Sequence, residues 1–214
     1  MLSSISPLDG RYDAQLNELR PYLSEFGLIK HRITIEILWF ISLSENKKIK
    51  EVPGFSKTTI KALKMVAESF SEKQAAEVKK IEQTTNHDVK AIEYWLKETF
   101  KKNKDLKPYL EFFHFACTSE DVNNLSYALM VKRSTQDVIL TKLEALVENI
   151  YTQAKKYADV AMLARTHGQS ASPTTMGKEF ANVAARLKRQ ISQLKKQKFL
   201  GKMNGAVGNF NAHQ

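Results

Sequence analysis

The chain has 214 residues, of which 43% are hydrophobic and 26% are charged, a balance that is ordinary for a globular protein with a buried core. No apolar run is long enough to cross a membrane, and the single cysteine, Cys117, excludes an internal disulfide. Only eight glycines and five prolines interrupt the chain, which favours long helices over many short strands. The composition therefore predicts a reduced, cytoplasmic, helical protein.

The formal net charge is +10, and its lysines and arginines gather at 47–50, 101–104 and 186–202. Such a surface can attract nucleic acid or a polyanionic small molecule. However, no nucleic-acid motif accompanies the charge, and aromatic residues do not alternate with the lysines. We interpret these runs as solvated helix faces and loops.

Residues 1–22 read as irregular, and a cluster of Pro, Asp and Gly at 7–10 is typical of a turn. The turn leaves Arg11 and Tyr12 just past a bend. Composition alone favours an ordinary surface turn at this place.

Apolar residues then recur at steps of three and four, the period of a helix. The first such segment, 23–45, is predicted to be strongly amphipathic. Ser56 can cap a second helix, while Ser71 and Gln74 fit a capping box that opens a third helix ending near Ile81.

A polar cluster, Asn86-His87-Asp88, interrupts this pattern. Thr85 or Asn86 can cap the helix that follows, and Asp88 would lie in its first turn, where the helix dipole favours negative charge. A helix start therefore accounts for the cluster except for His87.

We place a domain boundary in the basic segment before Pro108, between an N-terminal helical domain, residues 1–107, and a long-helix bundle domain, residues 108–214. In the second domain a helix opens near Thr118 and Ser119, with acidic residues in its first turn. Its apolar face continues over nearly forty residues, to Tyr157. Such a length predicts a bundle that packs against helices of its own and neighbouring subunits.

Residues 165–174, Arg-Thr-His-Gly-Gln-Ser-Ala-Ser-Pro-Thr, break this helical pattern and are predicted to form a polar bend. The next helix begins near Met176 and is expected to end at Gly201, before a glycine-rich loop at 204–209. Within the bend, His167 can exchange a proton near neutral pH and is the candidate catalytic residue.

Three polar breaks, at 86–88, 118–121 and 165–174, lie at the starts of helices, where free backbone amides favour anions. The sequence has no P-loop, GxGxxG, CxxC, GxSxG or HxxxH pattern, so nucleotide-cofactor and metal sites are unsupported. The patterns alone indicate a helical protein with candidate anion-binding sites.

Five segments, taken together, resemble the adenylosuccinate lyase family in its bacterial form, within the fumarase and aspartase superfamily. They are DGRY at 9–12, TTNHDVKA at 84–91, FACTSED at 115–121, RTHGQ with the Pro-Thr pair between 165 and 174, and GKMNGAVGN at 201–209. The resemblance covers essentially the whole chain and corresponds to the N-terminal portion of the family. THGQ alone would indicate only the superfamily, whereas five segments in register are specific.

This resemblance implies an all-α fold, in which an N-terminal helical domain precedes the first long helices of the superfamily's bundle. It also implies a β-elimination that releases fumarate from adenylosuccinate, giving AMP, and from the related succinylated aminoimidazole carboxamide ribotide of purine synthesis. No metal or organic cofactor is expected, because positioned donors can stabilise the developing charge. The family's members are homotetramers, and neither nucleic acid nor a membrane is expected as a partner.

By position, the resemblance makes His167 the general acid that protonates the leaving amine. It also implies seven substrate contacts: Arg11 and Tyr12 at the phosphate, Asn86, His87 and Asp88 along the substrate, and Thr118 and Ser119 near the succinyl carboxylates. We expect His87 to orient the substrate, Glu120 and Asp121 to organise the helix start, and Cys117 to pack.

The family's general base is a serine on a loop with the signature SSxMPxKxNP, and the 214 residues contain no such signature. We therefore expect an N-terminal piece of the enzyme that is inactive alone. The alternatives are another superfamily lyase, acting on argininosuccinate or a malate-type substrate, and a non-catalytic basic helical module. The DGRY and NHDVKA segments favour the purine substrate.

Overall fold

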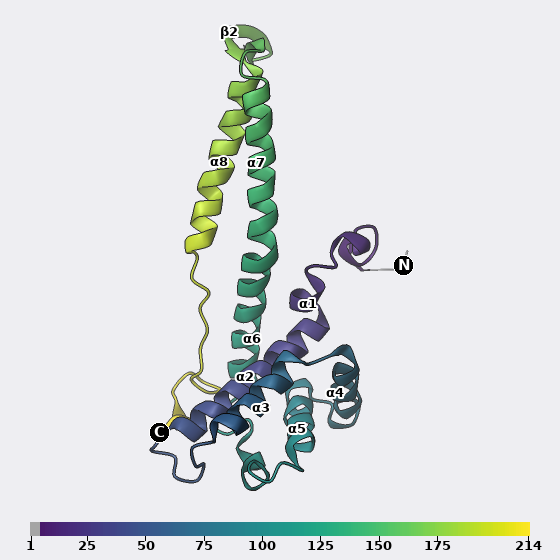
Figure 1. The fold of residues 1–214 in the computed structure, drawn as a ribbon, viewed down its shortest axis with the longest axis vertical. Coiled ribbons are helices and arrows are strands. Elements are labelled where there is room, and N and C mark those ends of the chain that lie inside the picture. Colours follow the sequence, from purple (N-terminus) through teal and green to yellow (C-terminus); the bar gives the residue numbers. More distant parts are fainter. Residues whose placement is uncertain (1–4) are drawn as a thin grey trace. The chain divides into compact units, whose positions relative to one another are not determined.

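The computed structural model describes residues 5–214, which form two compact units (Figure 1). Residues 5–132 and 199–214 make the first unit, and residues 133–198 make the second. Because residues 108–132 belong to the first unit, the compact units do not divide at residue 107. The domain boundary between residues 107 and 108 stays a prediction for the longer protein. None of the described helices is both long and apolar enough to span a lipid bilayer.

The first unit is helical, as predicted. Its α-helices are α1 (Arg20–Leu23), α2 (Glu25–Glu45), α3 (Lys57–Glu68), α4 (Glu72–Thr85), α5 (Asp88–Phe100) and most of α6 (Ser119–Ser134). Short 3-10 helices lie before, between and after them: η1 (Pro7–Asp9), η2 (Asp13–Gln15), η3 (Lys107–Phe112) and η5 (Asn211–His213).

Serine residues are the N-caps of two of these helices, as predicted from the sequence. The Ser56 hydroxyl accepts a hydrogen bond from the Thr59 amide at 3.1 Å, and the Ser71 amide donates to the Gln74 side chain at 2.9 Å. However, α4 continues to Thr85, four residues beyond the predicted end.

Helix α2 is the central helix of the first unit and packs against α3, α4 and α5. Ile33 and Phe40 are fully buried in the main core, while Ile35 belongs to a second apolar cluster. The prediction of a strongly amphipathic helix is therefore wrong, since α2 has little polar face. Even its charged residues Arg32 and Glu36 are buried, with exposed fractions of 5% and 0%.

Aromatic rings join α2 to the segment before α3 and to the segment after α5. The Phe40 ring centroid lies 4.9 Å from that of Phe55 and 4.3 Å from that of Phe113. Phe113 is also fully buried, so the chain that leads toward α6 is anchored in the same core as α2.

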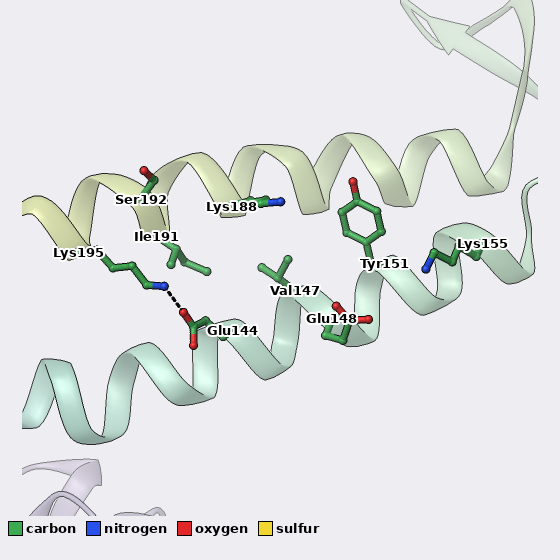
Figure 2. A pocket seen from close by; sticks show the side chains of 9 residues that line it. All are labelled: Glu144, Val147, Glu148, Tyr151, Lys155, Lys188, Ile191, Ser192 and Lys195. Atoms are coloured by element: carbon green, nitrogen blue, oxygen red, sulfur yellow. Dashed lines mark ion pairs between the residues drawn. The ribbon is translucent and has the colours of Figure 1, made fainter.

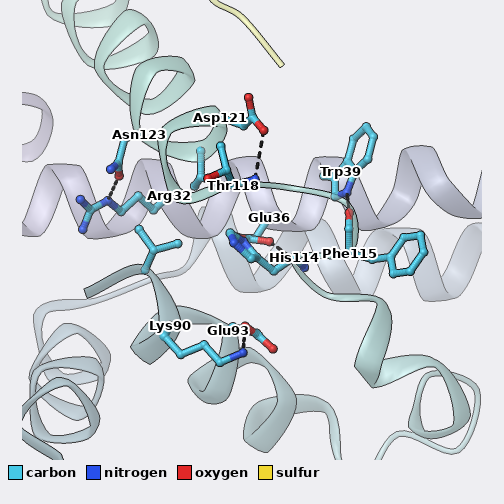
Figure 3. A network of polar contacts seen from close by, with 12 residues as sticks. Arg32, Glu36, Trp39, Lys90, Glu93, His114, Phe115, Thr118, Asp121 and Asn123 are labelled. Atoms are coloured by element: carbon cyan, nitrogen blue, oxygen red, sulfur yellow. Dashed lines mark hydrogen bonds and ion pairs between the residues drawn. The ribbon is translucent and has the colours of Figure 1, made fainter. Parts of the chain in front are cut away.

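Immediately before α6, polar groups of α2 hold a strained segment (Figure 3). His114 and Ala116 have φ angles of +60° and +61°, a conformation that is uncommon for residues other than glycine. The Glu36 carboxylate accepts a hydrogen bond from the His114 amide at 3.1 Å and lies 2.6 Å from His114 Nδ1. Trp39 Nε1 donates to the Phe115 carbonyl at 2.7 Å. These bonds compensate for the backbone strain.

The second unit contains a π-helical turn, η4 (Thr135–Ile139), then α7 (Leu140–Lys156), the strands β1 (Ala161–Thr166) and β2 (Gln169–Thr175), and α8 (Met176–Lys196). Helices α7 and α8 pack side by side (Figure 1). The predicted helical stretch of nearly forty residues is confirmed, because α6, η4 and α7 follow one another without a break.

The predicted bend at 165–174 is instead most of a β-hairpin, the one sheet among the described residues. Thr166 pairs with Gln169 across a turn made by His167 and Gly168, whose φ angles are +52° and +72°. Two consecutive residues with positive φ are typical of the type I′ turn, whose twist matches that of paired strands. The all-α fold class is right for the helices, and this hairpin is the exception to it.

The predicted end of the last helix at Gly201 is also wrong, because α8 ends at Lys196. Gly201 lies in the first unit, where a Cβ atom would come 2.4 Å from Leu125 Cδ2. The glycine therefore permits the chain after residue 199 to approach α6 closely.

Phe40→Ala should lower the free energy of unfolding of this chain by about 3–5 kcal/mol, since it removes a fully buried ring that contacts two others. Urea unfolding followed by circular dichroism measures the change. Leu38→Ala is the control, because that side chain is 45% exposed in the same helix and should cost less than about 1 kcal/mol. Equal losses for the two variants would contradict the assigned core.

His114→Gln should destabilise the chain more at pH about 5.5 than at pH about 9. Burial lowers the pKa of His114, but the hydrogen bond and charge of Glu36 outweigh burial and raise this pKa above its ordinary value. A raised pKa contributes stability that is fully present below the pKa of the unfolded chain and is lost as the pH rises through the folded pKa. In a Glu36→Gln background the larger destabilisation at low pH should disappear, because Glu36 then no longer outweighs the lowering effect of burial on the pKa of His114. Its persistence there would assign it to another group.

Candidate functional site

Arg11 and Tyr12 lie at an exposed turn between η1 and η2. The Arg11 guanidinium carbon is 5.7 Å from the centroid of the Tyr12 ring, so the two side chains stack. The turn thus presents a cation and a phenol to solvent, both of which can bind a phosphate group.

The junction between α4 and α5 contains the second predicted group. Asn86 has a left-handed φ of +48° and ends α4, with its amide donating to the Glu82 carbonyl at 2.8 Å. His87 is the N-cap of α5, and its Nδ1 accepts a hydrogen bond from the Lys90 amide at 3.2 Å. The prediction that Thr85 or Asn86 caps α5 is wrong, because Asn86 is required by the turn that closes α4.

Capping also determines which ring nitrogen of His87 is available. When Nδ1 accepts the amide hydrogen of Lys90, the proton of the neutral imidazole lies on Nε2. The side chain is exposed, so Nε2–H is free to donate to a ligand. This geometry suits a residue that orients a substrate.

Asp88 lies in the first turn of α5, as predicted, but its carboxylate already has partners. One oxygen accepts from the Val89 amide at 2.9 Å, and the other lies 2.7 Å from the Arg32 guanidinium. Partial burial raises the pKa of Asp88, and these two interactions outweigh burial and hold the pKa below its ordinary value. The carboxylate is therefore ionised and fixed in orientation.

The start of α6 carries Thr118 and Ser119, both half-buried. Asp121 is fully buried and accepts a hydrogen bond from the Thr118 amide at 3.0 Å, which confirms its predicted place at the helix start. Its carboxylate also accepts from Lys202 Nζ at 2.9 Å and from the Asn204 amide at 3.0 Å. Asp121 thus ties the glycine-rich loop to the start of α6.

The electrostatic balance at Asp121 is consistent with a permanent charge. Burial raises the pKa of Asp121, but the Thr118 amide and Lys202 lower it further than burial raises it. By contrast, burial and the nearby carboxylates of Glu36 and Asp121 raise the pKa of the Cys117 thiol. A thiol that stays protonated is a poor nucleophile, as expected for a packing residue.

His167 belongs to the second unit and occupies the tip of the hairpin. Its side chain is exposed, and the two-residue turn places it between the paired ends of β1 and β2. On the hairpin itself, Arg165 and Ser170 pair across the strands and line a hollow of about 660 Å³ together with Glu179. The turn therefore holds the His167 imidazole at the exposed end of the hairpin.

A second hollow of about 550 Å³ lies between α7 and α8 (Figure 2). Charged side chains line much of it, among them Glu148, Lys155 and Lys188, and Glu144 forms an ion pair with Lys195. None of the predicted site residues lines this hollow, so it is not the candidate site.

Within the first unit the structure connects two of the predicted groups. Arg32 contacts Asp88 at the start of α5 and Asn123 in α6, whereas Arg11 and Tyr12 lie at a separate turn. Arg32 is not among the residues predicted from the sequence, although its charge within an apolar helical segment was a signal. Among residues 5–214, no group of three or more His, Cys, Asp or Glu side chains is arranged to hold a metal ion.

Comparison with known proteins supports the resemblance seen in the five motifs. The chain is 51% identical over 212 residues to adenylosuccinate lyase of Escherichia coli strain K12, and 50% identical to that of Haemophilus influenzae strain Rd. In both cases the match covers 99% of this chain and 46% of the relative. The chain therefore spans about half the length of the curated relatives it matches.

The fold is also found in solved structures. A fumarate lyase from Mesorhizobium sp. BNC1 matches with a TM-score of 0.72 at 16% identity, covering 92% of this chain and 44% of that one. A β-carboxy-cis,cis-muconate cycloisomerase from Acinetobacter calcoaceticus matches with a TM-score of 0.71 at 17% identity, covering 92% and 44% respectively. A sequence model of the lyase family matches residues 10–214. The chain therefore belongs to the lyase family.

Proposed function

We propose that these residues form part of a lyase that cleaves adenylosuccinate to AMP and fumarate, and the related succinylated carboxamide ribotide in the same way. The observation that carries the proposal is the 51% identity, over 99% of the chain, to a protein named adenylosuccinate lyase. Structural likeness at 16% identity supports only the fold. The substrate assignment therefore depends on the sequence match and on the DGRY and NHDVKA segments.

In this β-elimination a base removes the proton from the carbon beside a carboxylate. The resulting electron pair forms the carbon–carbon double bond of fumarate, and the bond from carbon to the purine amine breaks. We assign to His167 the proton that the departing nitrogen takes up. Its exposed place at the hairpin tip and the ability of imidazole to carry a proton near neutral pH support this assignment.

The remaining predicted residues would bind the substrate. Arg11 and Tyr12 provide a cation and a hydroxyl for the phosphate, and Nε2–H of His87 provides a donor. Thr118 and Ser119 would use their hydroxyl groups, since the Thr118 amide is already bonded to Asp121. Asp88 would act through its fixed position, because Arg32 and the Val89 amide occupy both of its oxygens.

The general base is the part of the reaction that these residues do not supply. Only the family resemblance indicates a serine in an SSxMPxKxNP segment, which the 214 residues lack. We further propose that the longer protein is a cytoplasmic homotetramer whose active site combines segments of several subunits. The family resemblance is what supports this assembly.

In the full-length protein, His167→Ala should lower kcat for adenylosuccinate by about 100-fold or more while KM changes little, since the lost proton transfer acts in the transition state. Fumarate release followed by ultraviolet absorbance measures both constants. Ser172→Ala is the control, because that exposed residue lies on β2 of the same hairpin and should leave kcat unchanged. A kcat for His167→Ala within a few-fold of wild type would contradict the assignment of His167 as the general acid.

The 214-residue chain alone should bind AMP or adenylosuccinate weakly and should not release fumarate at an enzymatic rate, because it supplies an acid without the base. Chromatographic detection of AMP and fumarate after incubation tests this expectation. Turnover of adenylosuccinate by the isolated chain would refute it. Cleavage of argininosuccinate by the full-length protein, or salt-dependent binding of arbitrary DNA by the chain, would instead favour one of the two alternative functions.

A further inference from the structure

Helix α2 carries two buried charges one helical turn apart. Arg32 and Glu36 have exposed fractions of 5% and 0%, and neither is needed to continue the apolar core around them. Charged side chains are almost never buried this completely unless partners satisfy them, and a buried ion pair contributes little net stability because desolvation offsets the attraction. Their presence in the central helix therefore needs another explanation.

Arg32 finds its partners on two other helices, and Figure 3 shows its contact with Asn123. Its Nε donates to the Asn123 side-chain oxygen at 2.8 Å, and its terminal nitrogen lies 2.7 Å from the Asp88 carboxylate. Asp88 opens α5, and Asn123 lies in the second turn of α6. One guanidinium group thus joins the N-terminal turns of two helices that are distant in sequence.

Both contacts fall beside predicted substrate residues. Asp88 directly follows His87, and the Asp88 carboxylate that holds Arg32 also accepts the Val89 amide, which fixes the first turn of α5. Asn123 follows Ser119 by four residues, so the two side chains share one face of α6. A shift of Arg32 would therefore move both helix starts relative to each other.

Glu36 restrains the same region from a second point. Its carboxylate holds the amide and the ring of His114, in the strained segment that leads into Thr118 and Ser119. The two buried charges of α2, Arg32 and Glu36, thus restrain α6 from both sides of its first turn.

We propose that Arg32 is a positioning residue, whose two-partner contact with Asp88 and Asn123 sets the distance between the substrate-binding starts of α5 and α6. The inference rests on the proposed function of His87, Thr118 and Ser119. Arginine suits this task because its planar group offers donors in a fixed fork, whereas a lysine ammonium is a single point of charge.

The test compares Arg32→Lys and Arg32→Met in the full-length protein. Both should lower kcat/KM for adenylosuccinate by about tenfold or more, because small misplacements of binding groups reduce the rate steeply. Arg32→Lys should retain most of the thermal stability, since the charge opposite Asp88 remains. Hydrogen exchange should become faster in peptides covering 86–92 and 118–124, and slower or unchanged elsewhere.

Lys97→Met is the matched control, because Lys97 is also largely buried and pairs with Glu93 and Glu111 in the same unit. It should change Tm by as much as Arg32→Met but leave kcat/KM within about twofold. Wild-type kcat/KM in Arg32→Lys, or unchanged exchange at both helix starts in Arg32→Met, would overturn the positioning role. If the wild-type protein does not cleave adenylosuccinate, the proposed function fails, while the exchange data still decide the role of Arg32.

Discussion

Burial of α2 with its charges is the constraint on which the first unit depends. The helix lies at the centre of the main core, so Arg32 and Glu36 cannot reach solvent and must be satisfied by neighbouring segments. Their partners come from α5, from α6 and from the strained segment before α6. These two buried charges need hydrogen-bonding and ion-pair partners. This need restricts where the predicted substrate residues can lie.

The polar residues at the helix starts serve structure and the proposed chemistry together. His87 caps α5 through Nδ1 and leaves Nε2 to a ligand, and Asp121 accepts bonds from the start of α6 and from the glycine-rich loop. A helix start leaves backbone donors unsatisfied, so side chains placed there are held by the helix itself. Groups held in this way lose little additional conformational freedom when a substrate binds.

The hairpin gives His167 a different kind of support. A histidine with a φ of +52° is strained, and the type I′ turn requires this conformation because the strands on either side are paired. The turn thus fixes the backbone position of His167. This arrangement keeps the imidazole exposed, as the proposed role of His167 as general acid requires.

The sequence by itself determined the helices, their serine caps and the family, because helical periodicity, capping and motifs are local or near-local patterns. It also located the break at 165–174, but the pairing of β1 with β2 and the extent of α4 were not apparent from that break. Only the tertiary structure decided that most of the surface of α2 is buried and that Arg32 joins α5 to α6, since the partners of a charged side chain depend on which distant segments pack against it.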